Sequence, residues 1–443
     1  MKKFLLPACA LVLPWLAYAT ELSDTTDISS GKGLKIVRTT PEISKILNEN
    51  RPHDAHALPT PKFALTSNNN NFVMTIGGQF NLITGGDMGN DLYNQSGAGI
   101  SFVTNAIPVP AKEGYKGDFY INPLNGFIDL QVVAFANSAD ALTAYLKVGT
   151  NGINTSVALQ RAYLTYRGFT GGLKLTLFQD DYACQPPTID PEGPSGCVST
   201  LSYELSYKSK SYNGFRFALG LDMPTYYSAQ GYYRGHDYPK LDGEEVTTEV
   251  NHITPDIPMW VEYSFSSWNR IRLSGIIRTF AYKDMIKDEI RHTAGWGAML
   301  SGNVQPCDKW ILYYQAAYGK GIGDYIQDIA GHPYSFIPDD ANPGRMTASP
   351  MLGANIGVTF NPTKKLQFNA MFSEARIWDV ADYANAGDES ENYKYALYGA
   401  VNCFYNINSF LQVGVEYLYG HRQTWNIGGA NDSRLQAQLS FSF

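Results

Sequence analysis

Two cysteines lie close together in the segment "CQPPTIDPEGPSGC", which runs from Cys184 to Cys197. Cysteines at such a spacing occur in metal sites, in redox pairs and in loops closed by a disulfide. Proline and glycine between the cysteines are typical of a loop. No histidine or further cysteine lies nearby, so a metal site is disfavoured. The choice between a redox pair and a structural disulfide depends on the compartment in which the protein folds.

The N-terminus indicates that compartment. Met1 is followed by two lysines, the apolar run "FLLPACALVLPWLAYA" and small residues at Ala17 and Ala19. This pattern is typical of a secretory signal peptide cleaved after Ala19, so residues 1–19 are predicted to be removed. A membrane anchor is the alternative, but the run is shorter than the ~20 residues that a spanning helix needs. Because exported proteins meet oxidising conditions, we expect Cys184 and Cys197 to form a disulfide.

A second group of residues that could bind a solute is basic. Arg270, Arg272 and Arg278 are interspersed with apolar Ile271, Leu273 and Ile277. In a β-strand such alternation places the arginines on one face and the apolar side chains on the other. What these arginines face therefore depends on the sheet to which their strand belongs.

Strict alternation extends over much of the chain. In the terminal "SRLQAQLSFSF", Leu435, Leu439 and Phe441 share one face, while Arg434 and Gln436 share the other. An apolar face toward lipid and a polar face toward the lumen are typical of a transmembrane β-barrel strand. The alternative is an edge strand of a soluble sheet. About sixteen segments from residue 72 onward suit strands, so residues 72–443 are predicted to form an all-β, antiparallel outer-membrane barrel.

The connections between these segments alternate between tight turns and long polar loops, as periplasmic turns and extracellular loops do in outer-membrane barrels. Residues 20–71 lie outside this pattern. Thr40, Pro41 and the apolar Ile43, Ile46 and Leu47 predict one short helix there. We therefore expect residues 20–71 to form a periplasmic N-terminal arm that ends in a linker into the barrel.

The alternation also assigns charges to the lumen, because a basic side chain facing lipid near mid-bilayer costs about 2–4 kcal/mol. The basic residues predicted to line the pore are Lys147, Arg161, Arg167, Lys174, Arg216, Arg270, Arg272, Arg278 and Arg434. The acids predicted to face inward are Asp129, Glu204, Asp222, Glu262 and Glu416. Two interpretations stay open: these charges form ion pairs that hold the wall together, or they make a basic wall that attracts small anions.

Composition and the absence of known motifs argue against a nucleic-acid-binding protein and against an enzyme. The formal net charge is −7, which argues against a nucleic-acid partner. The sequence has no HExxH, GxSxG or Walker motif, so neither an enzyme, a cofactor nor a metal site is predicted. The tyrosine-rich segment "TYYSAQGYYRGHDY" favours, more weakly, a surface-exposed barrel whose loops bind a partner.

Four segments in order, "DDYACQPPTIDPEGPSGC", "YGKGIGDYIQD", "GVEYLYGHR" and the terminal "RLQAQLSFSF", resemble the DcaP-like outer-membrane porins of Gram-negative bacteria. The resemblance covers about residues 72–443. It implies a homotrimer in outer-membrane lipid and passive uptake of dicarboxylates or similar small anions. The arm lacks the sustained heptads of the coiled-coil segment that many members carry.

By the strand count, the cysteine segment lies in the third extracellular loop, which folds into the barrel in general porins. We expect its acids to face the basic wall across a constriction. These acids are Asp180, Asp181, Asp190 and Glu192. The alternative is a loop folded outward on the surface. The sequence thus predicts an outer-membrane porin for small polar or anionic solutes, with a constriction loop.

Overall fold

The computed structural model describes residues 33–49, 61–90, 92, 100–111, 119–150, 157–225, 240–241, 244–245, 247–249, 254–266, 268–331, 334–339, 341–378, 393–425 and 427–443. The predicted signal peptide (residues 1–19) and residues 20–32 of the predicted arm lie outside these ranges. No helix within the described ranges is long and apolar enough to cross a membrane.

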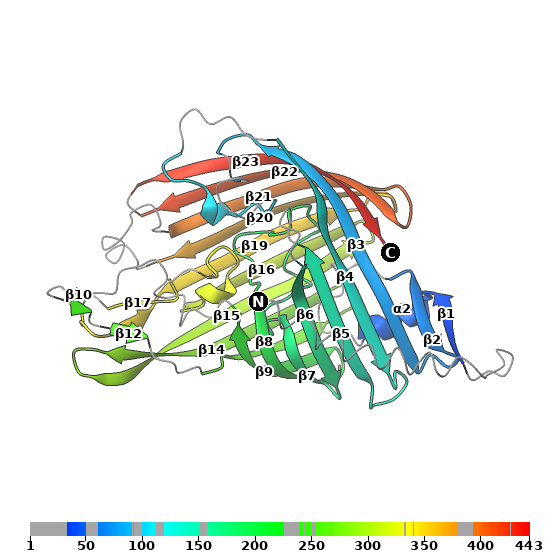
Figure 1. The fold of residues 1–443 in the computed structure, drawn as a ribbon, viewed down its shortest axis with the longest axis horizontal. Coiled ribbons are helices and arrows are strands. Elements are labelled where there is room, and N and C mark those ends of the chain that lie inside the picture. The colour runs from blue at the N-terminus through cyan, green and yellow to red at the C-terminus, as the bar shows by residue number, and fades with distance from the viewer. Residues whose placement is uncertain are drawn as a thin grey trace.

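Sixteen of the described strands form one closed antiparallel barrel (Figure 1). Each strand pairs with the next along the chain, and β23 closes the ring on β3, with Leu439 opposite Leu82. The strands are β3 (Phe72–Asp87), β4 (Phe119–Ala134), β5 (Leu142–Thr150), β6 (Val157–Tyr166), β7 (Phe169–Leu175), β8 (Leu201–Lys208), β9 (Phe215–Pro224), β13 (Ile257–Ser264), β14 (Arg270–Asp284), β15 (Glu289–Cys307), β16 (Trp310–Lys320), β19 (Pro350–Phe360), β20 (Leu366–Ile377), β21 (Tyr393–Asn406), β22 (Leu411–Thr424) and β23 (Gly429–Ser442). The predicted fold class and strand number are confirmed.

The two faces of the strands follow the predicted alternation. In β23, Leu435 is 51% exposed on the outside, whereas Arg434 and Gln436 on the inside are 0% and 2% exposed. In the described part of the chain each of the sixteen strands pairs with two neighbours, as a membrane-spanning sheet requires. The apolar outer face is therefore the face that contacts lipid.

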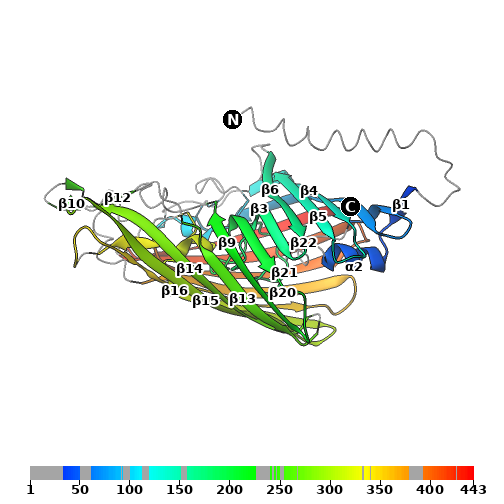
Figure 2. The same ribbon diagram turned by 90° about the horizontal axis from the view of Figure 1, so that it is seen from below.

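Short turns gather at one end of the barrel and long loops at the other. Arg167 and Gly168 alone join β6 to β7, and both have positive φ angles, of 48° and 86°. Such a two-residue turn matches the twist of a hairpin. The opposite end carries β10 (Lys240–Leu241) and β11 (Glu244–Glu245), which pair with each other, and β12 (Thr247–Glu249), which pairs with the end of β14 (Figure 2). By the rule for such barrels, the short-turn end is periplasmic.

The described part of the N-terminal arm lies at the short-turn end, near the C-terminus (Figure 1). It consists of β1 (Leu34–Arg38), α2 (Pro41–Glu49) and β2 (Phe63–Ser67). Thr40 caps α2, because its Oγ1 accepts a hydrogen bond from the backbone N–H of Ile43 at 3.3 Å. The short helix expected from the sequence is thus present.

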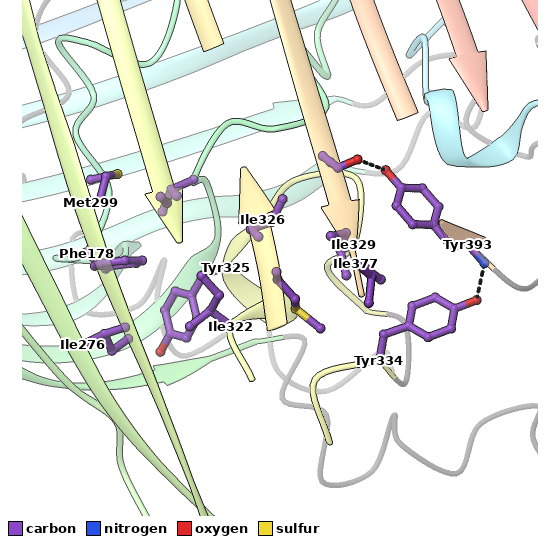
Figure 3. Close-up of a cluster of buried hydrophobic side chains, with 14 of the residues drawn as sticks. Phe178, Ile276, Met299, Ile322, Tyr325, Ile326, Ile329, Tyr334, Ile377 and Tyr393 are labelled. Carbon is purple, nitrogen blue, oxygen red and sulfur yellow. Dashed lines mark hydrogen bonds between the residues drawn. The ribbon is translucent and has the colours of Figure 1, made fainter. Parts of the chain in front are cut away.

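Three long connections fold into the barrel. We use the names L1, L3 and L6 for their described residues, which are 88–90, 92 and 100–111 in L1, 176–200 in L3, and 321–331, 334–339 and 341–349 in L6. L1 contains the short helix η1 (Thr104–Ala106), and L6 contains η3 (Gly323–Tyr325), β17 (Phe336–Pro338) and β18 (Met346–Ala348). Phe178 of L3 and Tyr325 of L6 meet edge to face at 5.9 Å, next to the wall residues Ile276 and Met299 (Figure 3).

These loops give the barrel an apolar core that the strands alone lack. Around Phe178, the L6 residues Ile322, Ile326 and Ile329 are at most 1% exposed. L1 makes a second cluster, in which Phe102 and Ile107 pack against Leu418 of β22. The extracellular half of the lumen is therefore largely filled on the side of β14 to β23.

Candidate lumen and constriction loop

L3 crosses the interior of the barrel. The side-chain amide of Asn355 donates to the carbonyl of Cys184, and the backbone N–H of Gly196 donates to Ser373 Oγ at 2.8 Å. The N–H of Val198 donates to Gln315 Oε1 at 3.0 Å. All three wall residues are on the lumen face, so L3 lies inside rather than on the surface.

L3 is closed by a disulfide between Cys184 and Cys197, whose Cα atoms are 5.9 Å apart. Closing a loop of this length contributes about 3 kcal/mol in the chain-entropy account. Cys307 and Cys403 are free. No group of three or more histidines, cysteines or acids that could hold a metal occurs in the described ranges, and the absence of a metal or cofactor stays a prediction.

Glu416 of β22 holds the tip of L3. Its carboxylate accepts hydrogen bonds from Thr188 Oγ1 at 2.6 Å and from the N–H groups of Ile189 and Asp190 at 3.0 and 2.9 Å. Asn402 Nδ2 and Gln436 Nε2 donate to the same carboxylate at 2.7 and 2.9 Å. A buried carboxylate with five donors is a strong anchor, because hydrogen bonds to charged groups are the stronger ones.

The carboxylate of Asp190 is held at this tip by hydrogen bonds to L1 and to the wall. Its carboxylate accepts hydrogen bonds from the N–H of Phe102 at 3.0 Å and from Tyr398 OH at 2.9 Å. The side chain is 2% exposed, and burial raises the pKa of the Asp190 carboxyl to about 7.

The basic row on β14 is buried beneath L3. Glu262 of β13 accepts from Arg270 Nη1 and Arg272 Nη2, both at 2.6 Å, and also pairs with Arg216. Asp180 of L3 pairs with Arg270 and accepts from Ser301 Oγ at 2.6 Å. Three arginines and two acids thus form one cluster, in which the side chains of Arg270 and Arg272 are 4% and 1% exposed. Arg272 also stacks over Trp260 at 4.3 Å.

Two more of the predicted pore arginines, Arg278 and Arg434, are buried in the same way. Arg278 is held between Asp256 at 2.9 Å and Asp324 of L6 at 2.7 Å. Arg434 forms a fork to Asp87 at 2.5 and 3.1 Å. The sequence predicted that both arginines line the pore, but L1, L3 and L6 cover them and neither lines the cavity described below.

Three further basic residues depart from the prediction. Lys174 donates to both oxygens of Glu204 at 2.9 Å, and the pair is buried. Arg216 is 29% exposed and belongs to the Glu262 cluster. Arg167 lies in the turn after β6, with a side chain 59% exposed beside Asp140, so its assignment to the lumen was wrong. The alternation rule does not apply there, because Arg167 follows the last residue of the strand.

A cavity of about 650 Å³ remains between L3 and the wall formed by β3 to β6 and by β21 to β23. Lys147 and Arg161 line it on the wall, and Asp181 and Glu192 line it on L3. Lys147 Nζ lies 4.0 Å from the centre of the Phe127 ring, and Glu192 accepts from Gln327 Nε2 of L6 at 2.9 Å. Of the predicted site, these four residues line the cavity together with Asp190, of which only 2% is exposed. Lys62 of the arm also lines it, and no strand alternation in the sequence pointed to that residue.

Aromatic rings border the apolar outer face. Toward the long-loop end, Tyr318 lies 6.1 Å from both Trp296 and Trp378. Ring pairs near the short-turn end are Phe169–Tyr207, Phe215–Tyr263 and Trp310–Phe360. Aromatic girdles at both interfaces are typical of outer-membrane barrels.

A closed sixteen-stranded ring with girdles, short turns at one end and an inward loop defines an outer-membrane β-barrel of the porin fold, and this fold resides in the outer membrane of Gram-negative bacteria. Among solved structures, the outer membrane channel DcaP of Acinetobacter baumannii is similar to this chain, with 16% identity and a TM-score of 0.66 over 84% of this chain and 98% of that chain. The resemblance predicted from the sequence is confirmed at the level of the fold.

Two more distant structures have TM-scores of 0.50 and 10% identity. OmpF of Salmonella typhi, in complex with daunomycin, matches over 85% of this chain and 99% of that chain. The trimer form of OmpT of Vibrio cholerae matches over 84% and 99%. No protein-family model and no curated protein matches the sequence.

Proposed function

We propose that this protein is a porin, a passive diffusion channel for small polar or anionic solutes. The observation that supports this function is the charged cavity inside the closed barrel, with Lys147 and Arg161 on the wall and Asp181 and Glu192 on L3. Fixed charges along a pore determine which solutes it prefers. A disulfide-closed loop anchored on both sides of the lumen keeps such a constriction in shape.

Anions are the preferred class. Lys147 and Arg161 are fixed to strands, and both residue types bind carboxylates, arginine through its two-pronged guanidinium. Because the pKa of Asp190 is raised to about 7, most of that carboxyl is protonated at pH 6, which reduces the negative charge of L3. Anion preference should therefore strengthen as the pH falls from 8 to 6. Small dicarboxylates are the candidate solutes that the resemblance to DcaP-like porins implies.

Reversing the two wall charges tests this function. The double variant Lys147→Glu and Arg161→Glu should admit small carboxylates more slowly than the unchanged protein, since acids would then line both sides of the cavity. Swelling of liposomes containing the protein, in dicarboxylate and in a neutral sugar of similar size, measures the effect. The carboxylate rate should fall at least severalfold relative to the sugar rate.

The matched control reverses two lysines outside the lumen. Lys364 and Lys365 are exposed in the turn between β19 and β20, so Lys364→Glu with Lys365→Glu makes the same change in charge without altering the cavity. Equal carboxylate rates in the two double variants would count against the wall as the origin of selectivity.

A homotrimer is part of the same proposal, because the resemblance implies it and a trimer form of Vibrio cholerae OmpT has a similar fold. Native mass spectrometry in detergent tests it, and a monomer alone would contradict it.

The alternative function, partner binding by tyrosine-rich residues 225–238, falls almost wholly outside the described residues. That the protein is not an enzyme stays a prediction.

A further inference from the structure

The N-terminal arm is joined to the barrel by backbone pairing. β1 and β2 are antiparallel, with Ile36 opposite Leu65, and β2 continues onto the start of β3, with Ala64 opposite Thr75. β23 pairs with β3 from Gln79 onward, and Phe443 continues this pairing to Gly78 but no further. β2 therefore takes the edge of β3 that the barrel leaves unpaired at its periplasmic end.

The helix of the arm packs against the inner face of the wall. Ile43 and Leu47 of α2 are 2% and 1% exposed and contact Val73 and Val133. Gln131, on the same face of β4 as Val133, donates from Nε2 to the carbonyl of Leu47 at 3.0 Å. Since this is the face of β4 that turns away from lipid, the helix sits at the periplasmic mouth of the lumen.

The residues just before β2 also pack closely against the wall. A Cβ atom on Gly77 of β3 would lie 2.9 Å from Pro61 Cγ, so the wall has a glycine where the arm crosses it. Thr39 fixes the same point, because its Oγ1 donates to the carbonyl of Pro61 at 2.6 Å and its N–H donates to the carbonyl of Lys62 at 2.9 Å. The backbone of Lys62 is thereby held in place.

Lys62 is the residue that the arm adds to the cavity. It lines the same cavity as Lys147 and Arg161, together with the polar wall residues Gln79 and Asn81. An additional positive charge in a confined lumen raises the local concentration of anions. A solute passing the two wall cations would meet Lys62 as the contribution of the arm.

We propose that the arm is a built-in part of the pore, which narrows the periplasmic mouth and supplies Lys62 as an anion-attracting residue. This inference rests on the proposed porin function. It gives the described residues of the arm, 33–49 and 61–67, a role in selectivity rather than in tethering or assembly alone.

The first test neutralises Lys62. Lys62→Gln should lower the chloride-to-potassium permeability ratio about twofold, because a unit charge that acts through salt-screened water over ~8 Å attracts chloride and repels potassium to a similar extent. The reversal potential across a planar bilayer in a potassium chloride gradient measures this ratio. Lys35→Gln is the matched control, because Lys35 is an exposed lysine of the same arm that does not line the cavity. Equal ratios in the two variants would overturn the role of Lys62.

The second test releases the helix. Leu47→Asp places a charge in the apolar contact between α2 and the wall, so the arm should leave the periplasmic mouth. The single-channel conductance should then rise, and the chloride-to-potassium permeability ratio should fall as in Lys62→Gln. Leu34→Asp is the control, since Leu34 is 51% exposed on β1. Unchanged conductance and ratio in Leu47→Asp would overturn the inference. A protein without any conductance would refute the porin function and this inference with it, whereas a conducting protein insensitive to these changes would refute the inference alone.

Discussion

Replacing Glu262 with alanine should lower the free energy of unfolding by about 3–5 kcal/mol, because removing one partner of a buried ion cluster leaves charges uncompensated. Glu262 is fully buried and pairs with Arg216, Arg270 and Arg272. Without it, three arginines face the single carboxylate of Asp180. Guanidinium unfolding in lipid vesicles, followed by tryptophan fluorescence, measures the loss.

The Asp140 to Arg167 pair provides the control for that experiment. Both side chains are more than half exposed at the periplasmic turn, so Asp140→Ala should leave stability unchanged, as expected for surface ion pairs. If Glu262→Ala were as stable as Asp140→Ala, the cluster would not hold β13, β14 and L3 together.

The second large effect is expected at the anchor of L3. Glu416→Ala removes the acceptor for five donors, three of them in L3. The free energy of unfolding should fall by about 3 kcal/mol, because each lost hydrogen bond to a charged group costs roughly 1.5–3 kcal/mol and the losses are not additive. Thr188, Ile189 and Asp190 line the cavity, so a released tip should give larger and noisier conductance steps.

Gln412→Ala is the matched control for Glu416→Ala. Gln412 lies on the same strand and lines the same cavity, but its amide donates to Asn406 rather than to L3. A similar side-chain volume is lost in both variants, so a difference between them reports on the loop. Conductance traces that cannot be distinguished would contradict the anchoring role of Glu416.

The sequence predicted the barrel well because alternation is a local property of each strand. The faces of Arg434 and Leu435, or of Arg272 and Leu273, follow from position along the strand alone. Whether an inward side chain is buried or open to the lumen does not follow from its position along the strand, because burial depends on loops that are distant in sequence. Arg278 is covered by Asp324 of L6, which is 46 residues away.

The inward loops themselves left only a partial signal. The cysteines and prolines of L3 marked it as a stapled segment, and four wall and loop charges predicted from the sequence do meet at the cavity. L6 carries Ile322, Ile326 and Ile329, an apolar content unusual for a surface loop, and this signal was missed. Lys62 had no periodic pattern around it, since its position is fixed by Thr39, Pro61 and the glycine at position 77.

The porin function as a whole is tested most directly by recording the purified protein in a planar bilayer with a potassium chloride gradient at pH 6. Discrete conductance steps with a reversal potential that favours chloride are the predicted result. An absence of steps, or a reversal potential that favours potassium, would contradict it.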